Sequence, residues 1–301
     1  MLSKPKSLDN IGHVVNSRLQ ELEINQKNPT PDTSKKQGID KWLDDGNSSD
    51  GSADSFEAAQ EEGACSLQQS EQDATKLIDI ELIKLLKYCH QLKDVRETDD
   101  YQDDIMEKAI ELGKKSHDKL LIFDMDETLI AAKQGDKLPE KFETTFDYDL
   151  NGVKISVRLR PYVLDVLERL STLYEIIVFT AGIQKYADPI LDYLDSSKKI
   201  FKRRLYRTDC IFVHKFFVKD LDIILDRDKE KMIIVDNSIV SFAFDLDNGV
   251  PINSYYGTEN EDRELLFLLS FLEEAAKSDD VRRPIADSFR LSQLQSSILN
   301  R

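Results

Sequence analysis

The chain has 301 residues, and its 57 acidic residues against 41 basic ones give a formal charge of −16. This balance argues against nonspecific or direct nucleic-acid binding, and no apolar run is long enough to span a membrane. The three cysteines, Cys65, Cys89 and Cys210, form no CxxC or Cys/His cluster, so neither zinc nor a disulfide framework is expected. Without a secretory signal, we expect a nuclear or cytoplasmic protein.

Residues 1–72 are rich in Ser, Asp, Gln, Asn and Lys and contain few apolar side chains. Such a segment cannot bury enough surface to offset its ordering entropy, so we predict an acidic, disordered tail. Two stretches depart from this pattern: residues 11–24 have loosely helical apolar spacing, and Trp42 lies in IDKWLDD. They fit either a transient helix in a solvated tail or a motif that docks a protein partner.

Residues 73–116 carry apolar side chains at helical spacing and are predicted to form a helical extension. This extension would pack on the core or, alternatively, pair with a partner. Strands and helices then alternate. The predicted strands are 120–123, 175–179 and 232–235, with a weaker one at 204–206, and the predicted helices are 162–173, 185–194 and 259–277. This alternation predicts an α/β fold with a parallel sheet covered by helices on both faces.

Residues 144–159 interrupt this alternation with a different pattern. Polar and apolar residues alternate around Asn151-Gly152, which predicts a small β-hairpin insertion. No segment is long enough to form a large cap domain over the carboxyl edge of the sheet. Residues 281–301 are polar, and we predict a mobile C-terminal tail.

Polar residues stand where the predicted strands end. Asp124 and Asp126 follow the first strand (DMDETL), Thr180 follows the second (VFTAG), and Asp236-Asn237 follow the third (IIVDNS). Lys219 (FVKDL) lies between the last two. Singly, these residues suit turns, a helix cap or a solvated surface. As an ordered series they supply a carboxylate nucleophile, oxygen ligands, a hydroxyl and an ammonium, which is the set required for phosphoryl transfer.

In this order the motifs resemble the haloacid dehalogenase (HAD) superfamily. The closer resemblance is to the small RNA polymerase II C-terminal-domain phosphatases and the NLI-interacting-factor-like family. It also rests on RPYVLDVLERL, VFTAGIQKYADPILDYLD, CIFVHKFFVKDL and NGVPINSYYG, and covers roughly residues 119–281. The resemblance implies a HAD-like phosphatase domain over residues 117–280, with a Rossmann-like parallel sheet.

The resemblance also implies a role for each motif residue. Asp124 would be the nucleophile that forms an aspartyl-phosphate, and Asp126 the general acid and base. Mg²⁺ would be held by the Asp124 carboxylate, the Asp126 backbone carbonyl and the Asn237 side chain, with Asp236 behind these ligands or close to the lysine. The residues expected to bind the phosphoryl oxygens are Thr180 and Lys219.

Substrate recognition in this family is associated with an apolar pocket that accepts a proline near the phosphoserine. The matching residues are Tyr148, Leu150, Ile183 and Tyr186, with Arg207 at the position of an arginine near the phosphopeptide site. Alternatively, Tyr148 and Leu150 simply pack the hairpin onto the sheet. The insertion is shorter after Gly152 than in the best-known members, so the proline pocket and a polymerase-tail substrate stay open.

These observations favour a Mg²⁺-dependent protein serine/threonine phosphatase. Its expected substrate is the RNA polymerase II C-terminal domain or another Ser-Pro phosphoprotein. The missing cap favours a phosphorylated protein over a free metabolite. Two alternatives remain at this stage: a catalytically idle binding or scaffold member of the same fold, and a small-molecule phosphatase.

Overall fold

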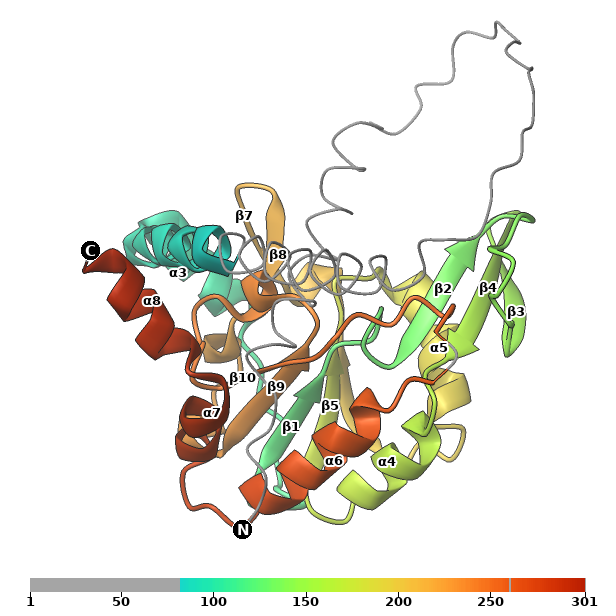
Figure 1. The fold of residues 1–301 in the computed structure, drawn as a ribbon. Helices are drawn as coiled ribbons and strands as arrows, with labels where there is room; N and C mark the ends of the chain where they lie inside the picture. Colours follow the sequence, from blue (N-terminus) through green and yellow to red (C-terminus); the bar gives the residue numbers. More distant parts are fainter. Residues whose placement is uncertain (1–81, 260, 301) are drawn as a thin grey trace, which may run out of the picture.

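The computed structural model describes residues 82–259 and 261–300 (Figure 1). The predicted tail over residues 1–72, with its candidate docking motif, lies outside the described residues. No helix in the described part of the chain is long and apolar enough to cross a membrane. Residues 82–93 are helical, and a short 3₁₀ turn at Asp94–Glu97 leads into α3 (Asp99–Lys108).

A five-stranded parallel sheet forms the centre of the molecule, in the order β10-β9-β1-β5-β6. Its strands are β1 (Leu120–Phe123), β5 (Glu175–Phe179), β6 (Phe201–Leu205), β9 (Met232–Asp236) and β10 (Gly249–Pro251). The three inner strands are buried along their whole length, which explains their continuous apolar runs. The predicted α/β fold is therefore confirmed. The weaker strand predicted at 204–206 corresponds to β6, which begins three residues earlier, at Phe201.

The register of the sheet decides which side chains meet at its carboxyl edge. Phe123 of β1 is paired with Val178 of β5 on one side and with Val235 of β9 on the other. All three strands therefore end at the same level, no more than one residue after these paired positions. This common level brings the polar residues that follow the strands to one edge of the sheet.

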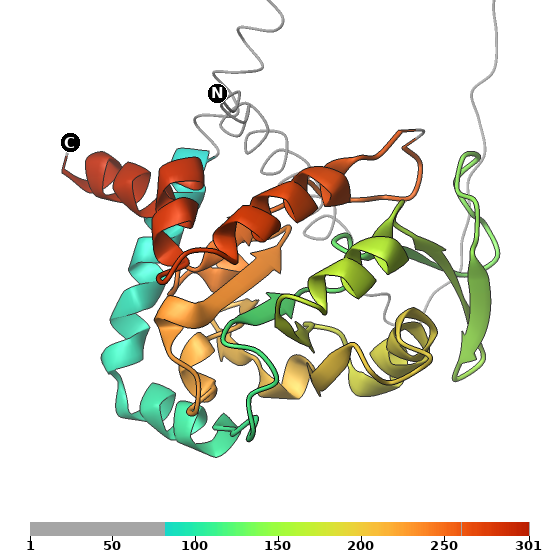
Figure 2. The same cartoon turned by 90° about the horizontal axis from the view of Figure 1, so that it is seen from below.

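Helices cover both faces of the sheet. On one face, Leu121 and Phe123 share a buried cluster with α4 (Val163–Leu170), α5 (Gln184–Leu194) and α6 (Glu264–Ala275). On the other face, Leu120 and Ile122 share a second cluster with residues 82–93 and α3. Figure 2 shows α4 and α6 on one side of the strands and the N-terminal helices on the opposite side.

The chain on either side of the expected phosphatase domain also belongs to this core. Leu86 and Leu92 are fully buried, so the part of the predicted helical extension that the structure describes, from residue 82 on, packs on the sheet. The prediction of a mobile tail over residues 281–301 is wrong. This segment forms α7 (Arg282–Phe289) and α8 (Leu291–Leu299). Its composition is polar on average, but Ile285 and Leu291 are buried and anchor the two helices to the core.

The predicted hairpin is confirmed and gains a third strand. β3 (Phe146–Leu150) and β4 (Val153–Leu159) are joined at Asn151 and Gly152, which have φ angles of 54° and 82°. Positive φ at both positions is what a two-residue hairpin turn of type I′ requires. β2 (Ile130–Gln134) pairs with β4, so this small antiparallel sheet grows directly from the loop after β1. A separate two-stranded hairpin, β7 (Ile211–Val213) and β8 (Phe216–Val218), precedes Lys219.

Candidate active site

The loop after β1 presents its two aspartates to the same side. The Asp124 N–H donates to the Val235 carbonyl at 2.9 Å, which extends the parallel ladder by one residue and fixes the aspartate at the sheet edge. Met125 is fully buried between the two acids. Since alternate residues of extended chain point to opposite sides, burying Met125 directs Asp124 and Asp126 outward together. Glu127, next in the chain, has a φ of 59° and turns the chain sharply toward β2.

Lys219 joins two of the predicted acids. Its Nζ lies 2.5 Å from Asp124 Oδ1 and 2.6 Å from Asp236 Oδ2, and only 1% of the lysine is exposed. Burial by itself lowers the pKa of Lys219, but attraction by the two carboxylates and their hydrogen bonds outweigh burial and raise the pKa above its ordinary value. The lysine is therefore a permanent cation beside Asp124.

Asp126 lies between Thr180 and Tyr186. The Tyr186 hydroxyl donates to Asp126 Oδ1, while Thr180 Oγ1 lies 3.5 Å from Asp126 Oδ2. Thr180 also accepts the Gly182 N–H at 2.9 Å, which holds its hydroxyl over the start of α5. Burial, and then the charge of Asp126, raise the pKa of Tyr186, so its hydroxyl is a neutral donor. The sequence motif identified Tyr186 only as a wall of the substrate pocket.

Asn237 is held by two partners that sequence analysis did not identify. Its Nδ2 donates to Glu127 Oε2 at 2.8 Å and to Ser254 Oγ at 2.9 Å. These bonds fix the amide plane and direct Oδ1 away from Glu127 and Ser254. Both partners come from loops distant in sequence, so the local DNS motif carries no sign of them.

The donor set suits Mg²⁺. Asp124 supplies a carboxylate, Asn237 an amide oxygen and Asp126 a backbone carbonyl, and all three are hard oxygen ligands. Among the described residues there is no group of three or more His, Cys, Asp or Glu side chains that could hold a metal ion. Mg²⁺ usually takes only one or two protein carboxylates and fills its other positions with water and substrate phosphate, so the residues present fit this ion.

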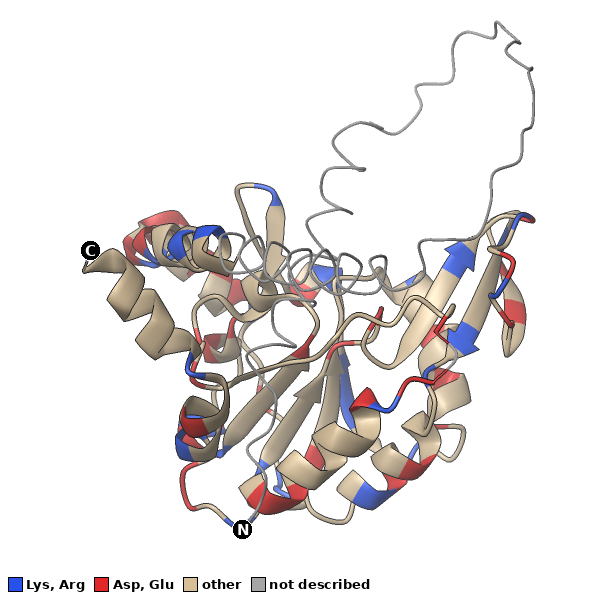
Figure 3. Ribbon diagram, viewed as in Figure 1, with Lys and Arg blue, Asp and Glu red and all other residues tan. Residues whose placement is uncertain are grey.

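All six motif residues line one cleft of about 530 Å³. They are Asp124, Asp126, Thr180, Lys219, Asp236 and Asn237. Figure 3 shows basic colouring on β2 close to this edge of the sheet, and the one basic residue of β2 is Lys133. Lys133 of β2 lines the cleft as well, a position that sequence analysis missed because β2 was not predicted to join the hairpin sheet.

The proposed pocket residues divide into two groups. Leu150, Ile183, Tyr186 and Arg207 line the cleft. Tyr148 is not among the lining residues: its hydroxyl donates to the Tyr186 carbonyl at 2.7 Å, so it contacts α5 from behind. Arg207 donates from Nε to the Ala181 carbonyl at 2.6 Å, and its guanidinium lies 5.0 Å from the centre of the Phe217 ring. These contacts hold Arg207 at the mouth of the cleft.

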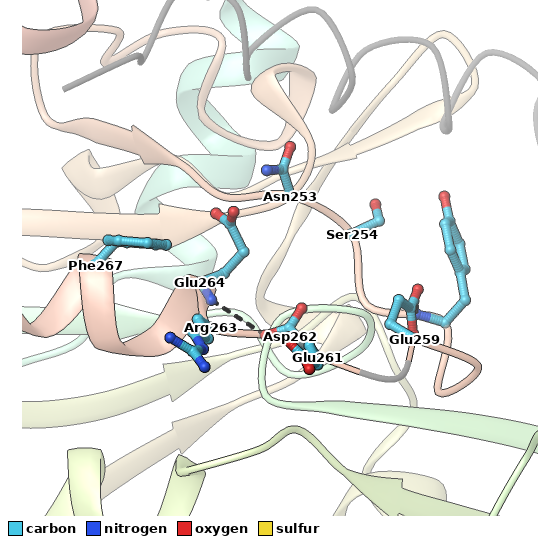
Figure 4. A pocket seen from close by; sticks show the side chains of 9 residues that line it. Asn253, Ser254, Glu259, Glu261, Asp262, Arg263, Glu264 and Phe267 are labelled. Carbon is cyan, nitrogen blue, oxygen red and sulfur yellow. Dashed lines mark hydrogen bonds between the residues drawn. The ribbon is translucent and has the colours of Figure 1, made fainter.

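A second hollow of about 640 Å³ lies beyond Ser254, on the far side of the Asn237 support (Figure 4). Its acidic lining residues are Glu259, Glu261, Asp262 and Glu264. Asp262 is held by Arg160 through a buried ion pair at 2.8 Å and accepts the Glu264 N–H at 3.2 Å. Because four acidic residues line this hollow against a single arginine, Arg263, the hollow would repel a phosphate. The cleft at the strand ends is the better candidate for phosphoryl chemistry.

Comparisons with known proteins cover this same region. The sequence model of the NLI interacting factor-like phosphatase family matches residues 119–282. "CTD small phosphatase-like protein 2" of Dictyostelium discoideum is 39% identical over 196 residues, which are 64% of this chain and 34% of that protein. "CTD small phosphatase-like protein 3" of Caenorhabditis elegans is 40% identical over 174 residues, 57% of this chain and 59% of that one.

The human "CTD small phosphatase-like protein" is 38% identical over 173 residues, which are 58% of this chain and 60% of that protein. The matches thus span between 34% and 60% of the lengths of these three relatives. The similarity includes β1 through β10 and the residues that line the cleft, whereas the helices before residue 119 lie outside the region that the family model matches.

Proposed function

The chain belongs to the family of NLI interacting factor-like phosphatases, and on that premise we propose that it hydrolyses phosphoserine or phosphothreonine in protein substrates. The observation that carries this proposal is the meeting of six motif residues in one cleft at the carboxyl edge of the sheet. They come from four separate segments of the chain. A role in a turn or a helix cap does not explain why Lys219 is buried between the carboxylates of Asp124 and Asp236.

In this proposal Asp124 attacks phosphorus through the carboxylate oxygen that Lys219 does not bind. The phosphorus–oxygen bond to the substrate breaks, and Asp126 gives its proton to the departing serine or threonine oxygen. Asp126 then takes a proton from the water that cleaves the aspartyl-phosphate, so one group acts as acid and base in turn. Lys219 and Thr180 donate to phosphoryl oxygens and stabilise the charge that develops on them.

Mg²⁺ is the metal that we propose for the oxygen ligands of the cleft. When bound, it would neutralise phosphate charge that otherwise repels the anionic Asp124. The residues that would hold it are Asp124, Asp126 through its backbone carbonyl, and Asn237. Glu127 and Ser254 support this set by fixing the orientation of the Asn237 amide.

The proposed substrate class is a phosphorylated protein segment. The insertions beside the cleft in the described residues are the sheet of β2, β3 and β4 and the hairpin of β7 and β8. Both are small, which leaves the strand ends accessible to an extended chain. A mouse relative bears the name "Carboxy-terminal domain RNA polymerase II polypeptide A small phosphatase 2", so the phosphoserines of that domain are the first peptides to test. Leu150, Ile155 and Ile183 are among the apolar residues that line the cleft and are suited to a neighbouring apolar side chain.

The nucleophile is tested by Asp124→Asn. The amide cannot form a stable acyl-phosphate, so Mg²⁺-dependent release of phosphate from p-nitrophenyl phosphate should fall by at least about a thousandfold. Asp165→Asn is the matched control, because Asp165 is an exposed carboxylate on α4, away from the strand ends. If Asp124→Asn keeps the rate of the parent protein, the nucleophile assignment is wrong.

The substrate class is tested with phosphopeptides of the polymerase C-terminal domain, carrying phosphate on different serines, with and without Mg²⁺. Release from at least one peptide in the presence of Mg²⁺ is the expected result. A preference for a serine followed by proline would support an apolar subsite beside the cleft. Absence of release from every peptide, in a protein that binds them, would favour the idle binding module instead.

A further inference from the structure

Resting on the proposed function, we infer that Tyr186 is a positioning residue whose hydroxyl orients the Asp126 carboxylate for proton transfer. The family resemblance offers Tyr186 only as part of an apolar substrate pocket. The hydrogen bond from its hydroxyl to Asp126 Oδ1 gives the side chain a second role, in the chemical step rather than in binding.

The two oxygens of Asp126 have different surroundings. Oδ1 accepts the Tyr186 hydroxyl, and Oδ2 accepts the Thr180 hydroxyl over a longer distance of 3.5 Å. Thr180 is the residue proposed to bind a phosphoryl oxygen, so Oδ2 is the oxygen turned toward the reacting bond. When Thr180 donates instead to a bound phosphoryl group, Oδ1 still accepts the Tyr186 hydroxyl, so the proton of the acid form resides on Oδ2. The tyrosine thereby selects the oxygen that gives its proton to the leaving group.

Tyr186 is itself firmly placed. Its hydroxyl is bound at Asp126, and its carbonyl accepts the Tyr148 hydroxyl at 2.7 Å. Its ring lies against Gly182, where an added Cβ would come within 3.0 Å of Tyr186 Cδ1. The absence of a side chain at Gly182 is what lets the ring approach the strand end. Three contacts in different directions therefore fix the hydroxyl relative to Asp126.

The Tyr148 bond extends this arrangement to the insertion. Tyr148 belongs to β3, and Leu150 of the same strand lines the cleft. The orientation of Asp126 is thus supported by α5, which the hairpin sheet contacts directly. In this arrangement the two predicted pocket tyrosines form a hydrogen-bonded connection to the general acid.

The two roles of Tyr186 differ in which atoms matter. A pocket wall needs the ring, whereas positioning of Asp126 needs the hydroxyl, so Tyr186→Phe separates them. The decisive measurement is kcat/KM with leaving groups of different basicity. A phosphoserine peptide and phenyl phosphate release strongly basic oxygens that need a proton from Asp126, and p-nitrophenyl phosphate releases a weakly basic phenolate that does not.

For Tyr186→Phe we expect kcat/KM to fall about ten- to a hundredfold with phenyl phosphate and with the peptide, the size expected for a lost hydrogen bond to a charged group. With p-nitrophenyl phosphate the fall should stay below about threefold. KM for the peptide should change little. Tyr193→Phe is the matched control, since Tyr193 lies on the same helix and its half-exposed ring stacks on Phe146 at 4.3 Å.

Two outcomes would overturn the inference. An equal loss with all three substrates would mean that the hydroxyl merely stabilises the site, and a raised KM for the peptide with both aryl phosphates unaffected would mean that Tyr186 is a pocket wall only. Thermal unfolding of both variants checks that the fold is retained. Failure of the proposed function would look different, because the parent protein would then hydrolyse none of the substrates.

Discussion

Replacing Lys219 by Met is expected to destabilise the protein strongly as well as to impair catalysis. The change removes an ammonium that contacts Asp124 Oδ1 at 2.5 Å and Asp236 Oδ2 at 2.6 Å, in a site where Lys219 and Asp236 are each only 1% exposed. Methionine has a similar length and fits the same space. What the variant loses is therefore mainly the positive charge between two buried carboxylates.

The contact distances set the size of the expected loss. At an effective dielectric constant of about 20, opposite unit charges 2.6 Å apart attract by about 6 kcal/mol. The cost of removing the ions from water offsets much of this attraction, so deleting one partner of a buried pair costs about 3–5 kcal/mol. For a protein of this size that corresponds to a fall in Tm of roughly 10 °C.

Urea unfolding followed by circular dichroism would measure the loss, with Asp236→Asn as the second change in a double-mutant cycle. Adding Asp236→Asn to Lys219→Met removes one of the two uncompensated charges, so the double variant should regain part of the stability lost by Lys219→Met. A loss below about 1 kcal/mol for Lys219→Met would refute this reasoning. So would a double variant whose losses simply add.

Two further predictions concern stability away from the cleft. Asp195 is buried and accepts the N–H groups of Lys199, Ile200 and Phe201; burial raises its pKa, but these bonds outweigh burial and lower the pKa below its ordinary value. Its stabilisation is therefore present above the unfolded pKa and is lost as pH falls through the folded value. Asp195→Asn should cost about 1–2 kcal/mol at pH 7 in urea unfolding, and the difference from the parent protein should shrink as acid protonates the parent aspartate. Gly249→Ala should cost about 2–3 kcal/mol in the same assay, because its Cβ would lie 2.1 Å from Phe242 Cε2 inside the core, and an unchanged midpoint would contradict the packing described there.

Much of the fold could be predicted because its signals are local. The runs at 120–123 and 175–179 have the bounds of β1 and β5, since strands buried on both faces must be apolar at every residue. The turn at Asn151-Gly152 could be predicted as well, because both of its residues have positive φ and Asn and Gly are among the few residue types that adopt this conformation readily. The strand ends then identified the positions of the cleft residues without any knowledge of the distances between them.

The remaining features depend on contacts between distant segments. Glu127 and Ser254 meet at Asn237, although they are 127 residues apart in the sequence. The direction of the Tyr186 hydroxyl depends on the space left by Gly182, which no residue pattern reports. The C-terminal helices were missed for a related reason: a few apolar residues such as Ile285 and Leu291 suffice when a ready-made surface receives them.

Because the N-terminal helices pack on the sheet, the folded core begins earlier in the chain than the segment that the family model matches. The family model begins to match at residue 119, but Leu86 and Leu92 already fill the face formed by Leu120 and Ile122. Each large apolar side chain exposed by trimming the chain to the matched segment would forfeit about 1.5–3 kcal/mol. Against a total stability of about 5–15 kcal/mol, a few such losses are enough to unfold a domain. The segment that identifies the family is therefore shorter than the segment that has to fold.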